Sequence, residues 1–147
     1  MCIRDRVYLV TPSPLLEEAI GYLSGRLGLK VVLCSGFSKK CRCDVFLKDL
    51  GPDEILSYIV NASFVLSGSF HATVFSILFG KRFATLLPDE KTNERIEDLL
   101  SCSGLPDRII RDEQMLGEHL FTEPEPCTEW KDRIEFSKER LQRELEI

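Results

Sequence analysis

The sequence predicts an α/β domain with a doubly wound, mostly parallel sheet and helices on both faces. Two observations lead to this prediction. Short apolar runs rich in strand-forming residues alternate along the chain with segments whose apolar residues recur at helical spacing. Turn and helix-start residues separate the two kinds of segment. Strands that are separated by helices imply a parallel sheet that is covered on both sides.

Residues 7–61 are predicted to form three strands and two helices. A TPSP turn places Pro14 near a helix start, and apolar residues then follow helical spacing up to Gly28. The second helix opens at Pro52, behind which two acidic residues favour the positive end of the helix dipole, and it continues to Asn61. The predicted strands are residues 7–10, 30–34 and 45–47, with a polar loop at 35–44.

Residues 62–83, ASFVLSGSFHATVFSILFGKRF, are the stretch around which the chain is organised. An apolar run over residues 64–66 predicts a strand, Gly68 breaks it, and a helical pattern starts at Phe70. Ser69 is a good N-cap residue, so the backbone N–H groups of Phe70, His71 and Ala72 point out of the helix start. Such a corner binds phosphate or carboxylate, and His71 in its first turn is able to exchange a proton near neutral pH.

The remaining chain continues the alternation and then changes character. Residues 82–87 are predicted as a strand, Asn93 as the cap of a helix that ends before Gly104, and residues 108–110 as a last short strand. A proline-containing linker at 122–128 leads to a charged terminal helix, in which Glu139 and Arg143 are spaced to pair. Its apolar stripe consists of Trp130, Ile134, Leu141 and Leu145.

Length and composition limit the organisation and the partners. The 147 residues suit one domain, predicted at 7–121, with the linker and terminal helix at 122–147. Residues 1–6, MCIRDR, match neither a strand nor a targeting signal and are interpreted as a truncated or non-native start. A net charge of −5 argues against nucleic-acid binding. The chain has no secretory leader and no apolar run of membrane-spanning length, which predicts a cytoplasmic protein, free or peripheral to the inner face of the membrane.

Several blocks together resemble the carboxyl-terminal half of the polysaccharide pyruvyl transferase family. These are GPDEILSYIVNASFVLSGSFHATVFSILFGKRF, NERIEDLL and GLPDRII, and the resemblance covers roughly residues 7–110. It depends on the ordered set of blocks and not on any single one. The family's usual serine-phenylalanine-histidine-glycine block is matched by Ser69, Phe70 and His71, whereas Ala72 stands where glycine is common.

The resemblance implies a Rossmann-like second domain of a two-domain enzyme of the glycosyltransferase-B type. Its implied activity is transfer of the enolpyruvyl group of phosphoenolpyruvate to a sugar hydroxyl, as a ketal, during exopolysaccharide biosynthesis. The implied partners are phosphoenolpyruvate, a sugar or lipid-linked saccharide acceptor and a missing N-terminal domain. His71 would be the general acid, and the fragment alone is expected to be inactive. The substrate-binding residues would be Ser69, Phe70, Ala72, Thr73 and Arg95.

Other interpretations remain open at this stage. His71 also fits a helix cap, and Arg95 also fits a solvated arginine that pairs with a nearby acid. A sugar-nucleotide glycosyltransferase domain and a non-catalytic anion-binding fragment are the alternative functions. No cofactor is expected, because TPSP stands where a dinucleotide-binding protein has its glycine-rich loop. Cys34, Cys41 and Cys43 lack the spacing of a zinc site, so no metal is expected.

Overall fold

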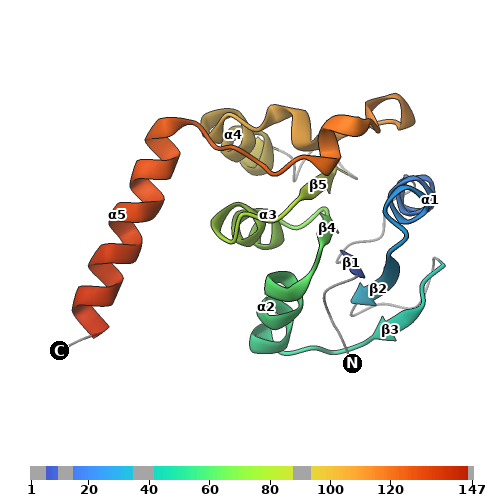
Figure 1. The fold of residues 1–147 in the computed structure, drawn as a ribbon, viewed down its shortest axis with the longest axis horizontal. Coiled ribbons are helices and arrows are strands. Elements are labelled where there is room, and N and C mark those ends of the chain that lie inside the picture. The colour runs from blue at the N-terminus through green and yellow to red at the C-terminus, as the bar shows by residue number, and fades with distance from the viewer. Residues whose placement is uncertain (1–5, 10–14, 35–41, 88–93, 146–147) are drawn as a thin grey trace.

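The predicted doubly wound parallel sheet is confirmed in the computed structural model, which describes residues 6–9, 15–34, 42–87 and 94–145. Six strands pair in parallel in the order β3-β2-β1-β4-β5-β6 (Figure 1). The strands are β1 (Arg6–Leu9), β2 (Lys30–Cys34), β3 (Val45–Leu47), β4 (Phe64–Ser67), β5 (Phe83–Leu86) and β6 (Ile109–Ile110). The helices are α1 (Leu16–Leu27), α2 (Pro52–Asn61), α3 (Phe70–Leu78), α4 (Glu94–Ser103) and α5 (Thr128–Leu145).

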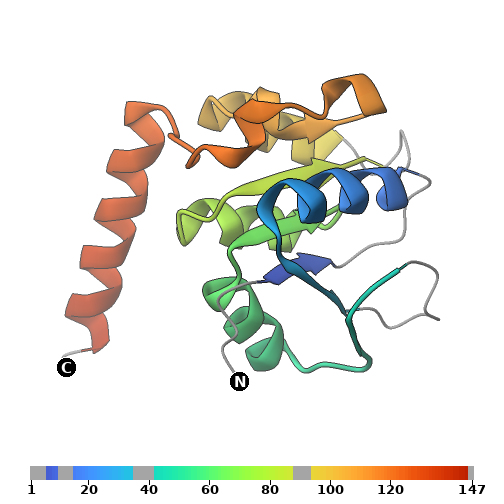
Figure 2. The same ribbon diagram turned by 45° about the vertical axis from the view of Figure 1, so that its right-hand side comes forward.

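Each face of the sheet has its own apolar core. On one face, α1 packs through Leu16, Ala19, Ile20 and Leu23, and Leu120 from a short 3-10 turn completes this layer. On the other face, α2, α3 and α4 bury residues such as Ile59, Ile77 and Leu100. Figure 2 shows α1 in front of the strands and α3 behind them. Strands β4 and β5, which lie between the two cores, are buried over their whole length, as expected for a sheet covered on both sides.

The strand order reverses between β1 and β4. The chain goes outward from β1 to β2 and β3, and then returns to place β4 on the opposite side of β1. In doubly wound sheets, ligands bind beyond the carboxyl ends of the strands at such a reversal. Helix α3 follows β4 directly, so its amino terminus lies at this edge of the sheet.

Several predicted boundaries shift by a residue or more. The strand predicted at 7–10 begins one residue earlier, at Arg6, whose register partner is Lys30. The predicted last strand at 108–110 is shorter, because Pro106–Arg108 form a 3-10 turn before β6. Val10, Pro14 and Asn93 lie outside the described residues.

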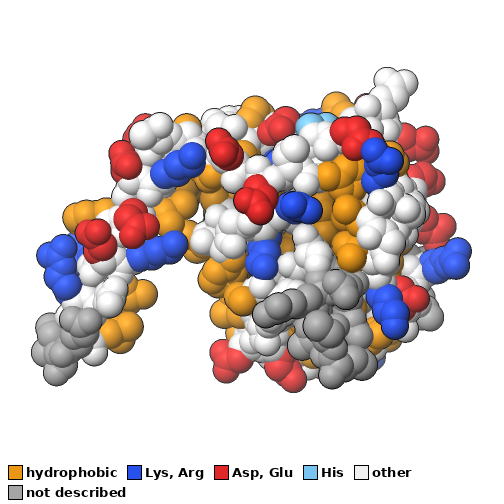
Figure 3. Space-filling view, in the orientation of Figure 1, with side chains coloured by type: hydrophobic (Ala, Val, Ile, Leu, Met, Phe, Trp, Pro, Cys, Tyr) orange, Lys and Arg blue, Asp and Glu red, His pale blue; other side chains and the backbone are white. Residues whose placement is uncertain are grey.

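Helix α5 leaves the body of the domain, and its charged side chains alternate along it in Figure 3. Its predicted apolar stripe is only partly covered. Ile134 packs against the core beside α3, whereas Leu141 is 59% exposed and Leu145 is 77% exposed. The predicted pair of Glu139 and Arg143 is confirmed at 3.9 Å. None of the described helices has the length and apolar character needed to cross a membrane.

Candidate functional site

The start of α3 forms where the sequence predicts it. β4 ends at Ser67, and Ser69 is the N-cap residue with extended backbone angles of φ −90° and ψ 134°. The helix begins at Phe70. The predicted capping role of the Ser69 side chain is wrong in one respect, because its hydroxyl accepts no capping hydrogen bond. The turn is therefore fixed by other groups.

Two hydroxyl groups bond to the backbone of Ser69, and a third bonds to one of these two. The Ser67 hydroxyl accepts a hydrogen bond from the Ser69 N–H at 2.9 Å, and the Thr73 hydroxyl donates to the Ser69 carbonyl at 2.9 Å. The Thr73 and Thr85 hydroxyls lie 3.2 Å apart, which ties α3 to β5. All three side chains are at most 3% exposed. The Thr73 hydroxyl therefore bonds to groups of the protein, whereas the family resemblance implies that it binds the substrate.

The backbone N–H groups of the three residues that follow Ser69 are available to donate hydrogen bonds. Within the described ranges, no group accepts a hydrogen bond from the N–H of Phe70, His71 or Ala72. The first intrahelical bond of this turn is donated by Thr73 to the Ser69 carbonyl, at 3.1 Å. These amides carry the positive end of the helix dipole and suit an anion.

His71 and Ala72 point in different directions from this turn. The His71 side chain is exposed, as a group that reacts with a bound molecule requires. Ala72 is 3% exposed and belongs to the core beneath the helix. Its methyl group faces the protein, so Ala72 has only its backbone N–H to offer a ligand.

Arg95 lies beside this turn although it comes from another helix. It is in the first turn of α4, and its guanidinium carbon sits 4.5 Å from the centre of the Phe70 ring. The Phe70 ring in turn meets the His71 ring edge-on, with 5.9 Å between their centres and 84° between their planes. No carboxylate of the described residues pairs with Arg95, and nearby Glu97 is bound by Arg111 instead. Among the described residues, the partner of Arg95 is therefore an aromatic ring and not an acid.

A family model for the polysaccharide pyruvyl transferases matches residues 6–90. This is more than half of the chain. The chain belongs to the polysaccharide pyruvyl transferase family. No significant match was found among curated proteins. The matched range contains β1 to β5 and the whole start of α3, whereas Arg95 lies beyond it.

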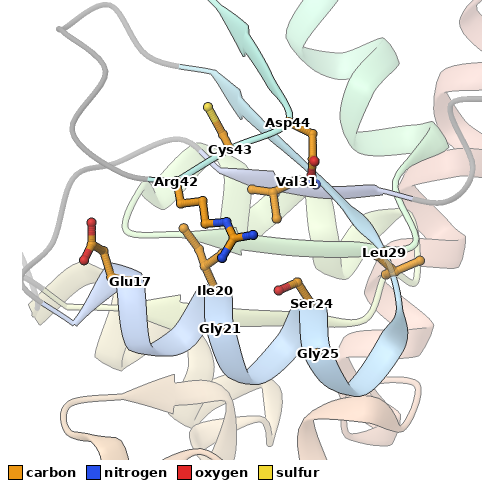
Figure 4. A pocket seen from close by; sticks show the side chains of 10 residues that line it. All are labelled: Glu17, Ile20, Gly21, Ser24, Gly25, Leu29, Val31, Arg42, Cys43 and Asp44. Atoms are coloured by element: carbon orange, nitrogen blue, oxygen red, sulfur yellow. Dashed lines mark hydrogen bonds between the residues drawn. The ribbon is translucent and has the colours of Figure 1, made fainter.

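The described part of the chain has a cavity elsewhere, which none of the predicted site residues lines. It measures about 610 Å³ and lies between α1 and the segment that leads into β3. Figure 4 shows Arg42 reaching toward α1, where Gly21 and Gly25 leave open space. The lining residues are Glu17, Ile20, Gly21, Ser24, Gly25, Leu29, Val31, Arg42, Cys43 and Asp44.

Metal ligands do not gather in the part of the chain that the structure describes. No group of three or more His, Cys, Asp or Glu residues there is arranged to hold a metal ion. Cys34 and Cys43 are thiols, and Cys41 lies outside the described residues.

Arg108 is the one deeply buried charged residue of the described chain, and sequence reasoning missed it. It is 2% exposed and lies at the amino edge of the sheet, just before β6. Its guanidinium donates to the carbonyls of Leu120 at 3.1 Å and Thr122 at 2.9 Å, and to that of Phe83 at 3.4 Å. Arginines are mostly exposed, so nothing in the local pattern distinguishes this one from its neighbours.

Proposed function

We propose that this chain is the donor-binding, carboxyl-terminal domain of an enzyme that transfers the enolpyruvyl group of phosphoenolpyruvate to a sugar as a ketal. One observation carries the proposal. In a member of this family, an exposed histidine and three amides with available hydrogens lie together where the strand order reverses. The product would be a pyruvylated surface polysaccharide or its lipid-linked precursor.

The start of α3 binds one anionic group of the donor. The N–H groups of Phe70, His71 and Ala72 point out of the helix, where the dipole is equivalent to about +0.5 of an elementary charge. The Ser69 hydroxyl makes no capping bond and stands at the same corner, so it is available as a further donor. Thr73 supports this corner from below through its bond to the Ser69 carbonyl.

His71 acts as the general acid of the transfer. A proton from the imidazole adds to the methylene carbon of the donor, which becomes a methyl group, and the central carbon becomes electrophilic. Two sugar hydroxyls then form new C–O bonds to that carbon, while its bond to the phosphate oxygen breaks. One hydroxyl proton replaces the proton that the imidazole gave up, and the other leaves with inorganic phosphate. The atoms balance as phosphoenolpyruvate and a diol giving a ketal and phosphate.

The first domain of a two-domain, glycosyltransferase-B-type enzyme supplies the acceptor side of the cleft. The His71 side chain at the start of α3 is exposed, and proton transfer to carbon needs oriented reactants and little water. The domain predicted at 7–121 therefore holds the donor, and the isolated chain binds it without efficient turnover.

A thermal-shift experiment on the 147-residue chain tests donor binding. Phosphoenolpyruvate at about 100 times its dissociation constant should add about 2.7 kcal/mol to stability and raise the melting temperature. A shift by a sugar nucleotide and not by phosphoenolpyruvate would indicate the glycosyltransferase alternative. A shift by neither would indicate a fragment without this donor site. His119→Asn is a matched control for His71→Asn, because both imidazoles are exposed and His119 lies at the opposite edge of the sheet, against the Asp107 carbonyl.

Turnover is tested in a family member that has both domains. Changing the histidine equivalent to His71 to asparagine should reduce acceptor-dependent phosphate release by roughly 10²–10⁴-fold. The fold should be retained, since the side chain is exposed. Unchanged turnover would remove His71 from the mechanism.

A further inference from the structure

We propose that Phe70 is a positioning residue, whose ring holds the Arg95 guanidinium beside the start of α3 so that Arg95 binds the second anionic group of the donor. This inference rests on the proposed function. It also changes the role of Phe70, which the sequence analysis assigns to the substrate itself.

The contacts of Phe70 support a role in holding Arg95. Phe70 is the first residue of α3, and its side chain is half-buried against the core under α3 and α4. One ring therefore touches the core, the guanidinium of Arg95 at 4.5 Å and the imidazole of His71 at 5.9 Å. A cation over an aromatic face within about 6 Å is attracted by the ring. Phe70 thereby contacts both Arg95 of α4 and His71 in the first turn of α3.

The charges around Arg95 leave its donors for a ligand. The described residues offer it no carboxylate partner, and Glu97 in the next turn is engaged by Arg111. A guanidinium that lies over a ring still presents its N–H groups at its edge, in the geometry that suits a carboxylate or phosphate. Both α3 and α4 start at the carboxyl edge of the sheet, so their positive ends add to the same field.

Phosphoenolpyruvate has two anionic groups, and the site offers two places for them. The amides behind Ser69 bind one group, and Arg95 on Phe70 binds the other. This division predicts selectivity, because a ligand with a single anionic group gains from only one of the two places. The phosphate group is assigned to the amides and the carboxylate to Arg95, so inorganic phosphate reports on the amides alone, whereas phosphoenolpyruvate reports on both.

A double-mutant cycle measures whether Phe70 acts through Arg95. Titration calorimetry with phosphoenolpyruvate compares the wild-type chain with Phe70→Leu, Arg95→Gln and the double variant. Each single change should weaken binding about tenfold, and the double variant should be no weaker than Arg95→Gln by more than about twofold. Phe70→Tyr should bind as the wild type does, because it keeps the aromatic face. Inorganic phosphate should bind all variants equally.

Matched controls come from the same chain. Phe79→Leu removes an aromatic ring from the far end of α3, where it stacks on Phe75, and Arg133→Gln removes an exposed arginine from α5. Neither should change phosphoenolpyruvate affinity. Leucine keeps apolar volume at position 70, and NMR spectra of each variant check that the fold is retained.

The outcomes separate this inference from the proposed function. Additive losses in the cycle, or equal losses of inorganic phosphate binding, would overturn the positioning role of Phe70. NMR gives a readout that needs no donor, since the δ-methylene protons of Arg95 should be shifted upfield by the Phe70 ring and return in Phe70→Leu. Absence of that shift would overturn the inference on its own. Failure of the wild-type chain to bind phosphoenolpyruvate, with the ring shift present, would instead contradict the proposed function.

Discussion

Arg95 and Arg108 both lie over a phenylalanine ring, but they differ in exposure, in their place on the sheet and in their hydrogen-bond partners. Arg95 is exposed at the carboxyl edge of the sheet, 4.5 Å above Phe70 and without a carboxylate partner among the described residues. Arg108 is 2% exposed at the amino edge, 5.8 Å from the centre of the Phe83 ring. Its terminal nitrogens are used by three backbone carbonyls and by the Thr122 hydroxyl.

The difference shows how the surroundings of a cation indicate its purpose. The donors of Arg108 are bonded to carbonyls of the segment that crosses from β6 toward α5, so this residue holds that segment against β5. Burial lowers the pKa of Arg108 and neighbouring Asp107 raises it. The group still stays charged at neutral pH, because the ordinary arginine value is far above it. Arg95 lies over a ring and has no carboxylate partner among the described residues, as the proposed contact with a ligand requires.

Loss of Arg108 should have the largest effect on stability. Arg108→Met removes the donors from three buried or half-buried carbonyls, which should cost about 2–4 kcal/mol. Urea denaturation measures this change, and phosphoenolpyruvate affinity should be unchanged in the folded variant because the two edges are separate. A stable variant with weakened donor binding would contradict the division between the two arginines.

An intermediate effect is expected at Thr73, which is buried beneath the exposed corner. Thr73→Val removes the hydroxyl that donates to the Ser69 carbonyl and leaves the Thr85 hydroxyl without this partner. The loss should be about 1–2 kcal/mol, again measured in urea, with a weaker thermal shift by phosphoenolpyruvate. Thr122→Val is a suitable comparison at the amino edge. A loss of stability without any change in the shift would show that the hydroxyl network supports the fold alone.

The smallest effect on stability is expected for Arg95. Arg95→Gln should change the free energy of unfolding by no more than about 0.5 kcal/mol, as is usual for exposed positions. Denaturation in urea beside Arg108→Met gives the comparison directly. A loss as large as that of Arg108→Met would mean that Arg95 is structural after all.

The sequence predicts the helix starts and ends well, because the local cap and turn residues lie where the fold needs a helix to begin or end. The start of α2 at Pro52, the end of α1 before Gly28 and the start of α3 at Phe70 all lie where cap and turn residues place them. Gly28 has a φ of 63°, a conformation that glycine adopts easily. Such signals act over a few residues, which is the range that a single sequence reveals.

Contacts between distant segments were not predictable in the same way. Phe70 and Arg95 were each candidates, but their pairing depends on how α3 and α4 pack. The sequence predicts that the Ser69 hydroxyl caps α3. Instead, the hydroxyls of Ser67, at the end of β4, and Thr73, within α3, bond to the Ser69 backbone. The stripe of α5 predicts a helix correctly, but its periodicity does not show that Leu141 and Leu145 stay exposed.

The bond between Thr73 and Thr85 has a thermodynamic consequence. Because α3 is tied to β5 beneath Ser69, the amides at its start keep their directions before any ligand arrives. A ligand that meets an already ordered turn loses little conformational entropy in binding. The proposed binding of a small anion at this turn would therefore need little ordering of the backbone.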